Sequence, residues 1–166
     1  MKIAIRQAMP QDVKIVSDIL CEAARWLDQN GMSLWKVGEL SPSNIADDVE
    51  ASLFYLAECD GKAAGTVRYQ LEDLLFWPDA QQEESAFIHR LAVRRDFAGG
   101  HVSSKLLQWA VERTRSLGRR YLRLDCEALR PRLRAIYECF GFRHHSDKQV
   151  GPYFVARYEY EVVKSF

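Results

Sequence analysis

The stretch "HRLAVRRDFAGGHVSSKLLQWA", residues 89–110, joins an apolar run to a helical pattern through a loop with two adjacent glycines. Apolar residues recur at helical spacing from Val102, so we expect a helix over 102–117 that Gly118 ends. The run 86–93 lacks clean alternation, as is typical of a central strand. The first amides of a helix have no intrahelical partners and lie at the positive end of its dipole. The junction is therefore a candidate anion site.

The two glycines of the loop, Gly99 and Gly100, would let a phosphate approach the backbone closely, because neither carries a side chain. The loop matches neither the GxGxxG pattern nor the Walker pattern. A plain turn between strand and helix is therefore the alternative that the loop by itself leaves open.

The segments on either side of this junction predict a mixed sheet. Asp60-Gly61 is the strongest hairpin signal, and Ser43 or Asn44 is the expected N-cap of the second helix. Because a helix separates 86–93 from 119–126, these strands should be parallel neighbours with a right-handed crossover. We expect strands over 2–8, 53–59, 62–71, 86–93, 119–126, 142–150 and 153–163, and helices over 13–29, 43–52, 102–117 and 131–140.

This element order predicts an α/β (α+β) fold with a central, mostly antiparallel sheet. One parallel βαβ pair and about four flanking helices complete it, and the sheet is not doubly wound. With 166 residues, the chain has the size of a single domain spanning 1–166. No 18-residue apolar run is present and the N-terminus lacks a signal-peptide pattern, so we expect a cytoplasmic protein that does not act at a membrane.

The four cysteines form no CxxC pair and have no histidine at ligand spacing, so we expect reduced, mostly buried thiols and no metal site. They are Cys21, Cys59, Cys126 and Cys139.

The net charge is zero, but it is unevenly distributed. Residues 1–88 carry 7 basic and 15 acidic side chains, and residues 89–166 carry 16 and 8. This split could place a polyanion on one side and a cation on the other, or it could reflect only solvated surface charges.

Three pieces of the sequence occur in the order of a known family. Leu91-Ala92-Val93 ends the central strand, the glycine loop runs over 98–103, and "YECFGF" follows at 137–142. Together with the predicted element order, they resemble the GCN5-related N-acetyltransferase (GNAT) superfamily over nearly the whole chain. The resemblance implies the GNAT fold and acetyl-CoA as cosubstrate, with no metal.

The resemblance also implies which residues bind the coenzyme. Backbone amides near Leu91 to Val93 would polarise the thioester carbonyl, and the loop amides would hold the pyrophosphate. Ala98 stands where the family has Gln or Arg, and His101 stands where it has its first signature glycine. The implied coenzyme residues are Leu91, Ala92, Val93, Arg94, Gly99, Gly100, His101, Val102, Ser103 and Ser104.

Acetyl transfer from a thioester to an amine requires a base for the amine proton, a donor for the oxyanion and an acid for the departing thiolate. Tyr137 stands where the family carries this acid. The base candidates are His89, Glu84 and Asp125. His89 has a reference pKa suited to base work near neutrality, but a water chain could serve instead. No nucleophile constellation is evident, so we expect direct attack in a ternary complex.

The acceptor is expected to be a primary amine, either small or on a polypeptide. The acidic loop 72–85 and the irregular segment 29–42 would flank it in this family, with Trp35, Glu83 and Tyr153 on the acceptor side. Trp77 could be a further wall, but the aromatic residues could equally belong to the core or to a dimer interface.

The alternative is a GNAT-fold binding or sensor protein with weak or no catalysis. Ala98 and His101 support this alternative, whereas Tyr137 and the intact triplet oppose it. The neutral total charge and the lack of a nucleic-acid motif weigh against a nucleic-acid partner. A homodimer stays open.

Overall fold

The computed structural model describes residues 2–32, 35 and 37–162. The chain forms two compact units, Met1–Tyr69 with Arg90–Leu107 and Gln70–His89 with Gln108–Phe166. The single domain over 1–166 stays a prediction. Seven strands are hydrogen-bonded in the order β1-β2-β3-β4-β5-β7-β6, which confirms the predicted mixed sheet.

The first unit contains an antiparallel meander. Strand β1 (Ile3–Gln7) pairs with β2 (Phe54–Cys59), and β2 pairs with β3 (Lys62–Gln70). Asp60 and Gly61 join β2 to β3 with φ angles of 50° and 83°. Two successive residues at positive φ are typical of a type I′ turn, so the predicted hairpin is confirmed.

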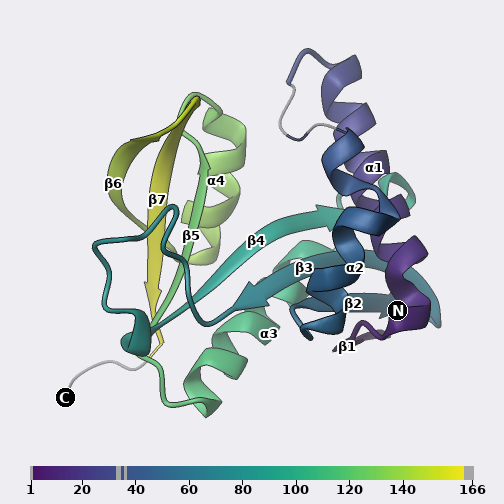
Figure 1. The fold of residues 1–166 in the computed structure, drawn as a ribbon, viewed down its shortest axis with the longest axis horizontal. Coiled ribbons are helices and arrows are strands. Elements are labelled where there is room, and N and C mark those ends of the chain that lie inside the picture. The colour runs from purple at the N-terminus through teal and green to yellow at the C-terminus, as the bar shows by residue number, and fades with distance from the viewer. Residues whose placement is uncertain (1, 33–34, 36, 163–166) are drawn as a thin grey trace. The chain divides into compact units, whose positions relative to one another are not determined.

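Two helices of the first unit, α1 (Val13–Gln29) and α2 (Pro42–Glu50), lie side by side, α1 in purple and α2 in blue in Figure 1. The N-cap of α2 is Ser41, so the prediction of Ser43 or Asn44 is wrong. Pro42 occupies the first helical position, where its fixed φ suits a helix and its missing N–H costs nothing. The helices bury Ile19, Leu20, Ile45 and Val49 in the core of this unit.

Strand β4 (Ser85–Val93) and strand β5 (Tyr121–Glu127) are parallel, with Ser85, Ala86 and Phe87 paired to Tyr121, Leu122 and Arg123. Helix α3 (Val102–Ser116) connects them, as predicted. Gly118, with φ 72°, follows the helix end. Within β4, Arg90 has φ 57°, a conformation that side chains other than glycine rarely adopt.

The second unit ends in a hairpin of β6 (Arg143–Val150) and β7 (Tyr153–Glu161), and β7 also pairs antiparallel with β5. Helix α4 (Pro131–Phe140) packs against β5 and β6 (Figure 1). The predicted hairpin around Gly151 is confirmed. The predicted strand over 153–163 ends at Glu161, and Val163 lies outside the described residues.

All four cysteines are free, three of them buried and Cys139 exposed, as predicted. Among the helices formed by the described residues, none has the length and apolar character needed to cross a membrane.

Candidate active site

A short 3-10 turn, η4 (Arg95–Phe97), follows β4, and the glycine loop then leads into α3. Gly99 has φ 80°, and no atom lies within 4 Å of the place that a Cβ would take, so its conformation rather than crowding requires glycine. His101 is exposed, and its carbonyl accepts the N–H of Lys105 at 2.9 Å and the hydroxyl of Ser104 at 3.0 Å. The backbone carbonyl of His101 therefore accepts the first hydrogen bond of α3, while its side chain stays exposed.

The start of the loop is held by α1 within the first unit. The backbone N–H of Arg95 donates to Glu22 Oε2 at 2.9 Å, and the Arg94 guanidinium lies 3.8 Å from Glu22 Oε1. The Arg95 guanidinium also lies 4.0 Å from the ring centroid of Trp26. These contacts fix the loop where it leaves β4, and they partly neutralise Arg94.

Trp35, predicted on the acceptor side, packs partly buried against the core of the first unit. The Arg90 guanidinium lies 5.3 Å from its ring centroid.

Tyr137 lies in the second unit, on the last turn of α4, and its side chain is buried. Burial raises its pKa well above the usual value for tyrosine, and the charges of Cys126 and Asp125 add to the shift, while Arg130 opposes it. Tyr137 is therefore neutral and keeps its proton at physiological pH.

A polar network attaches α4 to β7 and so fixes the position of Tyr137. The hydroxyl of Tyr158 donates to Glu138 at 2.6 Å and accepts from Arg134 Nε at 2.8 Å. The rings of Tyr137 and Tyr158 lie 6.4 Å apart between centroids.

Two of the predicted base candidates are neighbours in the second unit. His89 Nδ1 lies 3.4 Å from Asp125 Oδ1, while His89 Nε2 lies 2.8 Å from Asp73 Oδ2. The side chains of Asp73, His89 and Asp125 are 4%, 16% and 10% exposed. We call these three residues the Asp–His–Asp cluster.

Sequence reasoning missed Asp73 as a member of this cluster. Its Oδ1 accepts the backbone N–H groups of Leu75 and Phe76, and its own N–H donates to Gln82. An aspartate that accepts amides two and three residues ahead is a common turn signal, so the turn at Asp73 was predictable. Its contact with His89, 16 residues away, has no local signal in the sequence.

The two carboxyls of the cluster have opposite pKa shifts. Burial works to raise the pKa of Asp73, but the hydrogen bond and charge of His89 and two backbone amides outweigh it, so this pKa lies below its usual value. Burial raises the pKa of Asp125 to about 6. A pair of carboxyls with such different affinities for a proton is typical of acid–base sites.

The cluster also has the spacing of a metal site, since each of the three residues offers one ligand atom and these atoms lie within 4.8 Å of one another.

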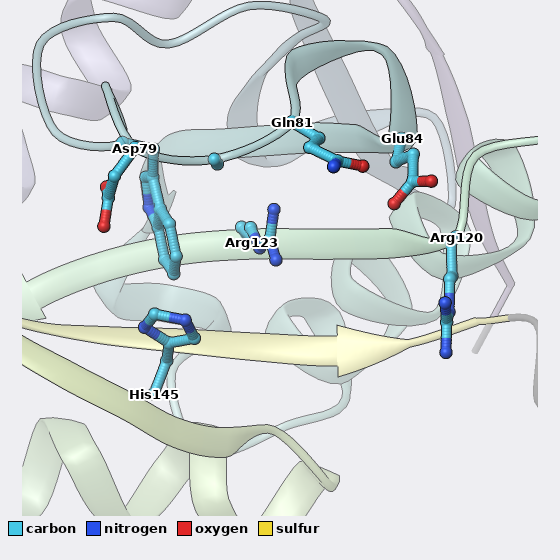
Figure 2. Close-up of a pocket in the computed structure, with 8 residues that line it drawn as sticks. Asp79, Gln81, Glu84, Arg120, Arg123 and His145 are labelled. Atoms are coloured by element: carbon cyan, nitrogen blue, oxygen red, sulfur yellow. The ribbon is translucent and has the colours of Figure 1, made fainter.

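The third base candidate, Glu84, is exposed and lies elsewhere in the second unit, in an open hollow of about 410 Å³ (Figure 2). In this view Glu84 and Arg120 are at one end of the hollow, and Asp79 and His145 are at the other. Among the described residues, the lining includes neither His89 nor Asp125. Of the three candidates, the structure therefore brings two together and leaves the third apart.

The acidic loop is anchored by a buried tryptophan. Trp77 is 1% exposed, and the guanidiniums of Arg123 and Arg157 lie 5.0 and 4.6 Å from its ring centroid. Asp79 accepts two bonds from Arg157, which hold the pKa of Asp79 at about 2. Trp77 is thus buried and also contributes to the lining of the hollow in Figure 2.

A second aromatic side chain of the same loop lies beside the cluster. The ring of Phe76 is 5.8 Å from that of His89 and 6.5 Å from that of Tyr153, which is 46% exposed. The ring of Phe76 therefore lies between the cluster and Tyr153, which was predicted on the acceptor side. Glu83, also predicted there, is exposed.

Comparison with known structures identifies the fold. A GNAT-family acetyltransferase from Listeria monocytogenes 4b F2365 superposes with a TM-score of 0.79 at 23% identity, covering 96% of this chain and 94% of that one. The PaiA N-acetyltransferase of Thermoplasma acidophilum, solved in complex with coenzyme A, gives 0.75 at 17% identity, covering 96% and 100%.

Sequence comparison identifies the family. Residues 21–142 match the acetyltransferase (GNAT) family. The uncharacterized N-acetyltransferase YesJ of Bacillus subtilis (strain 168) is 30% identical over 142 residues, which cover 81% of this chain and 78% of YesJ. The chain belongs to the acetyltransferase (GNAT) family, as the sequence motifs implied.

Proposed function

We propose that this N-acetyltransferase moves the acetyl group of acetyl-CoA to a primary amine by direct attack in a ternary complex. The observation that carries the proposal is the pairing of His89 with Asp125 in the same compact unit as Tyr137. The charge of Asp125 raises the pKa of Tyr137, so a candidate base influences the proton affinity of the candidate acid.

The coenzyme would be held by the glycine loop. The amides that open α3 have no intrahelical acceptors, and a pyrophosphate can take their hydrogen bonds. Gly99 and Gly100 are exposed and the side chain of His101 is not buried, which leaves the backbone open to a ligand. Arg90, with its left-handed backbone, directly precedes Leu91 to Val93, the residues that would polarise the thioester carbonyl.

The chemistry needs a proton to leave the amine and another to reach the thiolate. An alkylammonium has a pKa of roughly 10 and no lone pair, so the amine must be neutral when it attacks the carbonyl carbon. After the attack, the base removes a proton from the nitrogen that now bonds to the carbonyl carbon. The C–S bond breaks, and Tyr137 protonates the departing thiolate. We assign the base to the Asp–His–Asp cluster and not to Glu84, which lies in the hollow of Figure 2.

The acceptor would approach the cluster past Phe76 and Tyr153. Two carboxylates of the acidic loop are already paired, Asp73 with His89 and Asp79 with Arg157. The aromatic rings favour an amine that carries an aromatic or aliphatic group. The exposed carboxylates of Glu72, Glu83 and Glu84 add negative charge to the same loop. We also propose that Glu83 and Trp35 lie on the acceptor side and that the protein is cytoplasmic.

A panel of primary amines tests this function. Release of coenzyme A from acetyl-CoA is measured with benzylamine, phenethylamine, spermidine, lysine and a peptide with a free N-terminus. We expect turnover, fastest with the aromatic amines. Binding of acetyl-CoA without turnover on any of these amines would favour the alternative, a GNAT-fold sensor.

A further inference from the structure

Both ring nitrogens of His89 face carboxylates, so neither is left to take a proton directly from a substrate. Asp73 is 4% exposed, and both of its oxygens are engaged. Asp125 is the other carboxyl of the cluster, and a tenth of its side chain is exposed. Asp125 is therefore the member of the cluster placed to meet the amine.

We propose that Asp73 is a positioning residue that holds His89 with its proton on Nε2, so that Nδ1 offers its lone pair to Asp125 and the two share the proton taken from the amine. This inference rests on the proposed function and assigns the order of proton acceptors at the same site.

The argument for the tautomer begins at Asp73. Its Oδ1 is held by the amides of Leu75 and Phe76 at 3.2 and 3.0 Å, which leaves Oδ2 for His89 Nε2 at 2.8 Å. The lowered pKa of Asp73 keeps the carboxylate ionised, and an ionised carboxylate can only accept. Nε2 must therefore donate, and in the neutral imidazole Nδ1 then carries the lone pair.

The argument continues at Asp125. Its Oδ1 is buried, accepts no hydrogen bond from the described residues, and faces His89 Nδ1 at 3.4 Å. The lone pair of His89 Nδ1 and the carboxylate oxygen of Asp125 have no proton between them. One added proton would turn this contact into a hydrogen bond. The geometry therefore provides a place for one proton.

The charges around Asp125 set the affinity for that proton. Burial raises its pKa to about 6, and the charge of Asp73 adds to this effect. His89 on β4 and Arg157 on β7 lower it, and Arg157 lies directly across the strand register from Asp125. The charge of Asp125 in turn raises the pKa of Tyr137 on α4 and that of the Cys126 thiol on β5.

The proton balance closes without a further reactant. The amine nitrogen bonds to the thioester carbon, and its N–H bond breaks as the proton bonds to Asp125, which donates to Nδ1 of His89. The C–S bond breaks and the sulfur takes the proton of Tyr137. The proton of the Asp125–His89 pair then leaves to solvent, and Tyr137 regains one from solvent.

A metal ion is the competing occupant of the cluster, because the ligand atoms lie within 4.8 Å of one another. A shared metal would have to replace the 2.8 Å hydrogen bond between Asp73 and His89. If EDTA abolished the activity of the purified enzyme and zinc restored it, the proton-sharing role would be overturned.

The first test is the tautomer of His89, read from the ¹⁵N shifts of its ring in the labelled whole chain. We expect the Nε2–H form at pH 7.5 in the wild type. In Asp73→Asn the new amide can donate to Nε2, so the Nδ1–H form should replace it. Glu72→Gln, which removes the neighbouring exposed charge, should leave the tautomer unchanged. A wild-type Nδ1–H form, or no change in Asp73→Asn, would overturn the assignment.

The second test is the pH profile of coenzyme A release with acetyl-CoA and phenethylamine. We expect Asp73→Asn to lower kcat roughly 10- to 100-fold, to leave KM for acetyl-CoA unchanged, and to move the acid limb to lower pH, because Nδ1–H would stabilise ionised Asp125. A profile that superimposes on that of Glu72→Gln would overturn the inference. A wild type without turnover would contradict the proposed function instead, and the tautomer would still decide the role of Asp73.

Discussion

Asp125 is more easily protonated in the folded chain than in the unfolded chain. Its pKa rises from 3.8 to about 6 on burial, so the ionised carboxylate costs stability. Because the folded state binds the proton more tightly, the free energy of unfolding falls as pH rises through this window and is lowest above it.

Replacing this carboxyl by an amide should therefore stabilise the chain. We expect Asp125→Asn to raise the free energy of unfolding by about 1–3 kcal/mol at pH 7.5, with the gain vanishing near pH 4. Urea unfolding at both pH values checks this. Asp125→Asn should also lose acetyl transfer, and a gain in stability that is the same at pH 4 and pH 7.5 would contradict the pKa assignment.

Tyr137 provides the second prediction at the scale of the residue. Tyr137→Phe keeps the packing against Phe142 and Tyr158 but removes the proton that the thiolate needs. We expect kcat to fall by about 10²-fold with little change in KM for acetyl-CoA. Steady-state coenzyme A release measures both constants. Unchanged kcat would remove Tyr137 from the role of acid.

The sequence indicates candidate residues that lie on regular elements, and gives no signal for those that join the site through a distant contact. Tyr137, His89 and Asp125 could be named as candidates because they lie on regular elements near recognisable motifs. Asp73 could not, because its partner His89 is 16 residues away across a loop without periodicity. Arg90 could not either, since no glycine or asparagine marks its left-handed backbone.

At the scale of the element, Gly65 on β3 lets neighbouring segments of the first unit pack closely. A Cβ at this position would lie 2.9 Å from the carbonyl oxygen of Ala92 and 2.9 Å from a methyl group of Val102. Both are buried, and the carbonyl belongs to the backbone, so neither can move aside cheaply.

Gly65→Ala should therefore destabilise the chain by about 1–3 kcal/mol, measured by thermal or urea unfolding. Gly38→Ala is the matched control, since no atom lies within 4 Å of its Cβ position. We expect the control to change stability by less than about 1 kcal/mol. Equal effects of the two substitutions would show that the close approach at Gly65 is not rigid.

The elements themselves were largely predictable. The Asp60-Gly61 turn, the parallel strand pair and the closing hairpin all have local signals, and all are confirmed. The start of α2 was misplaced because Pro42 was assigned to the preceding segment and not to the first helical turn. The predicted third helix ran to Leu117, but α3 ends at Ser116 and Leu117 is 43% exposed.

At the scale of the whole molecule, the uneven distribution of charge would favour binding of the negatively charged coenzyme. Residues 89–166, with 16 basic and 8 acidic side chains, contain the loop that we propose for the phosphates of the coenzyme. Because these charges are mostly on the surface, salt screens them. We expect the affinity for acetyl-CoA to fall as sodium chloride rises from about 0.05 to about 0.5 M, which titrations at several salt concentrations would show. An affinity independent of salt would indicate that backbone contacts dominate.

The measurement that tests the central claim most directly is a calorimetric titration of the whole chain with acetyl-CoA. The claim is that the glycine loop, despite His101 and Ala98, still holds the coenzyme of an N-acetyltransferase. We predict saturable binding of one acetyl-CoA per chain, weakened in Gly99→Ala, whose φ of 80° strains any side chain. No heat of binding at millimolar acetyl-CoA would contradict the account.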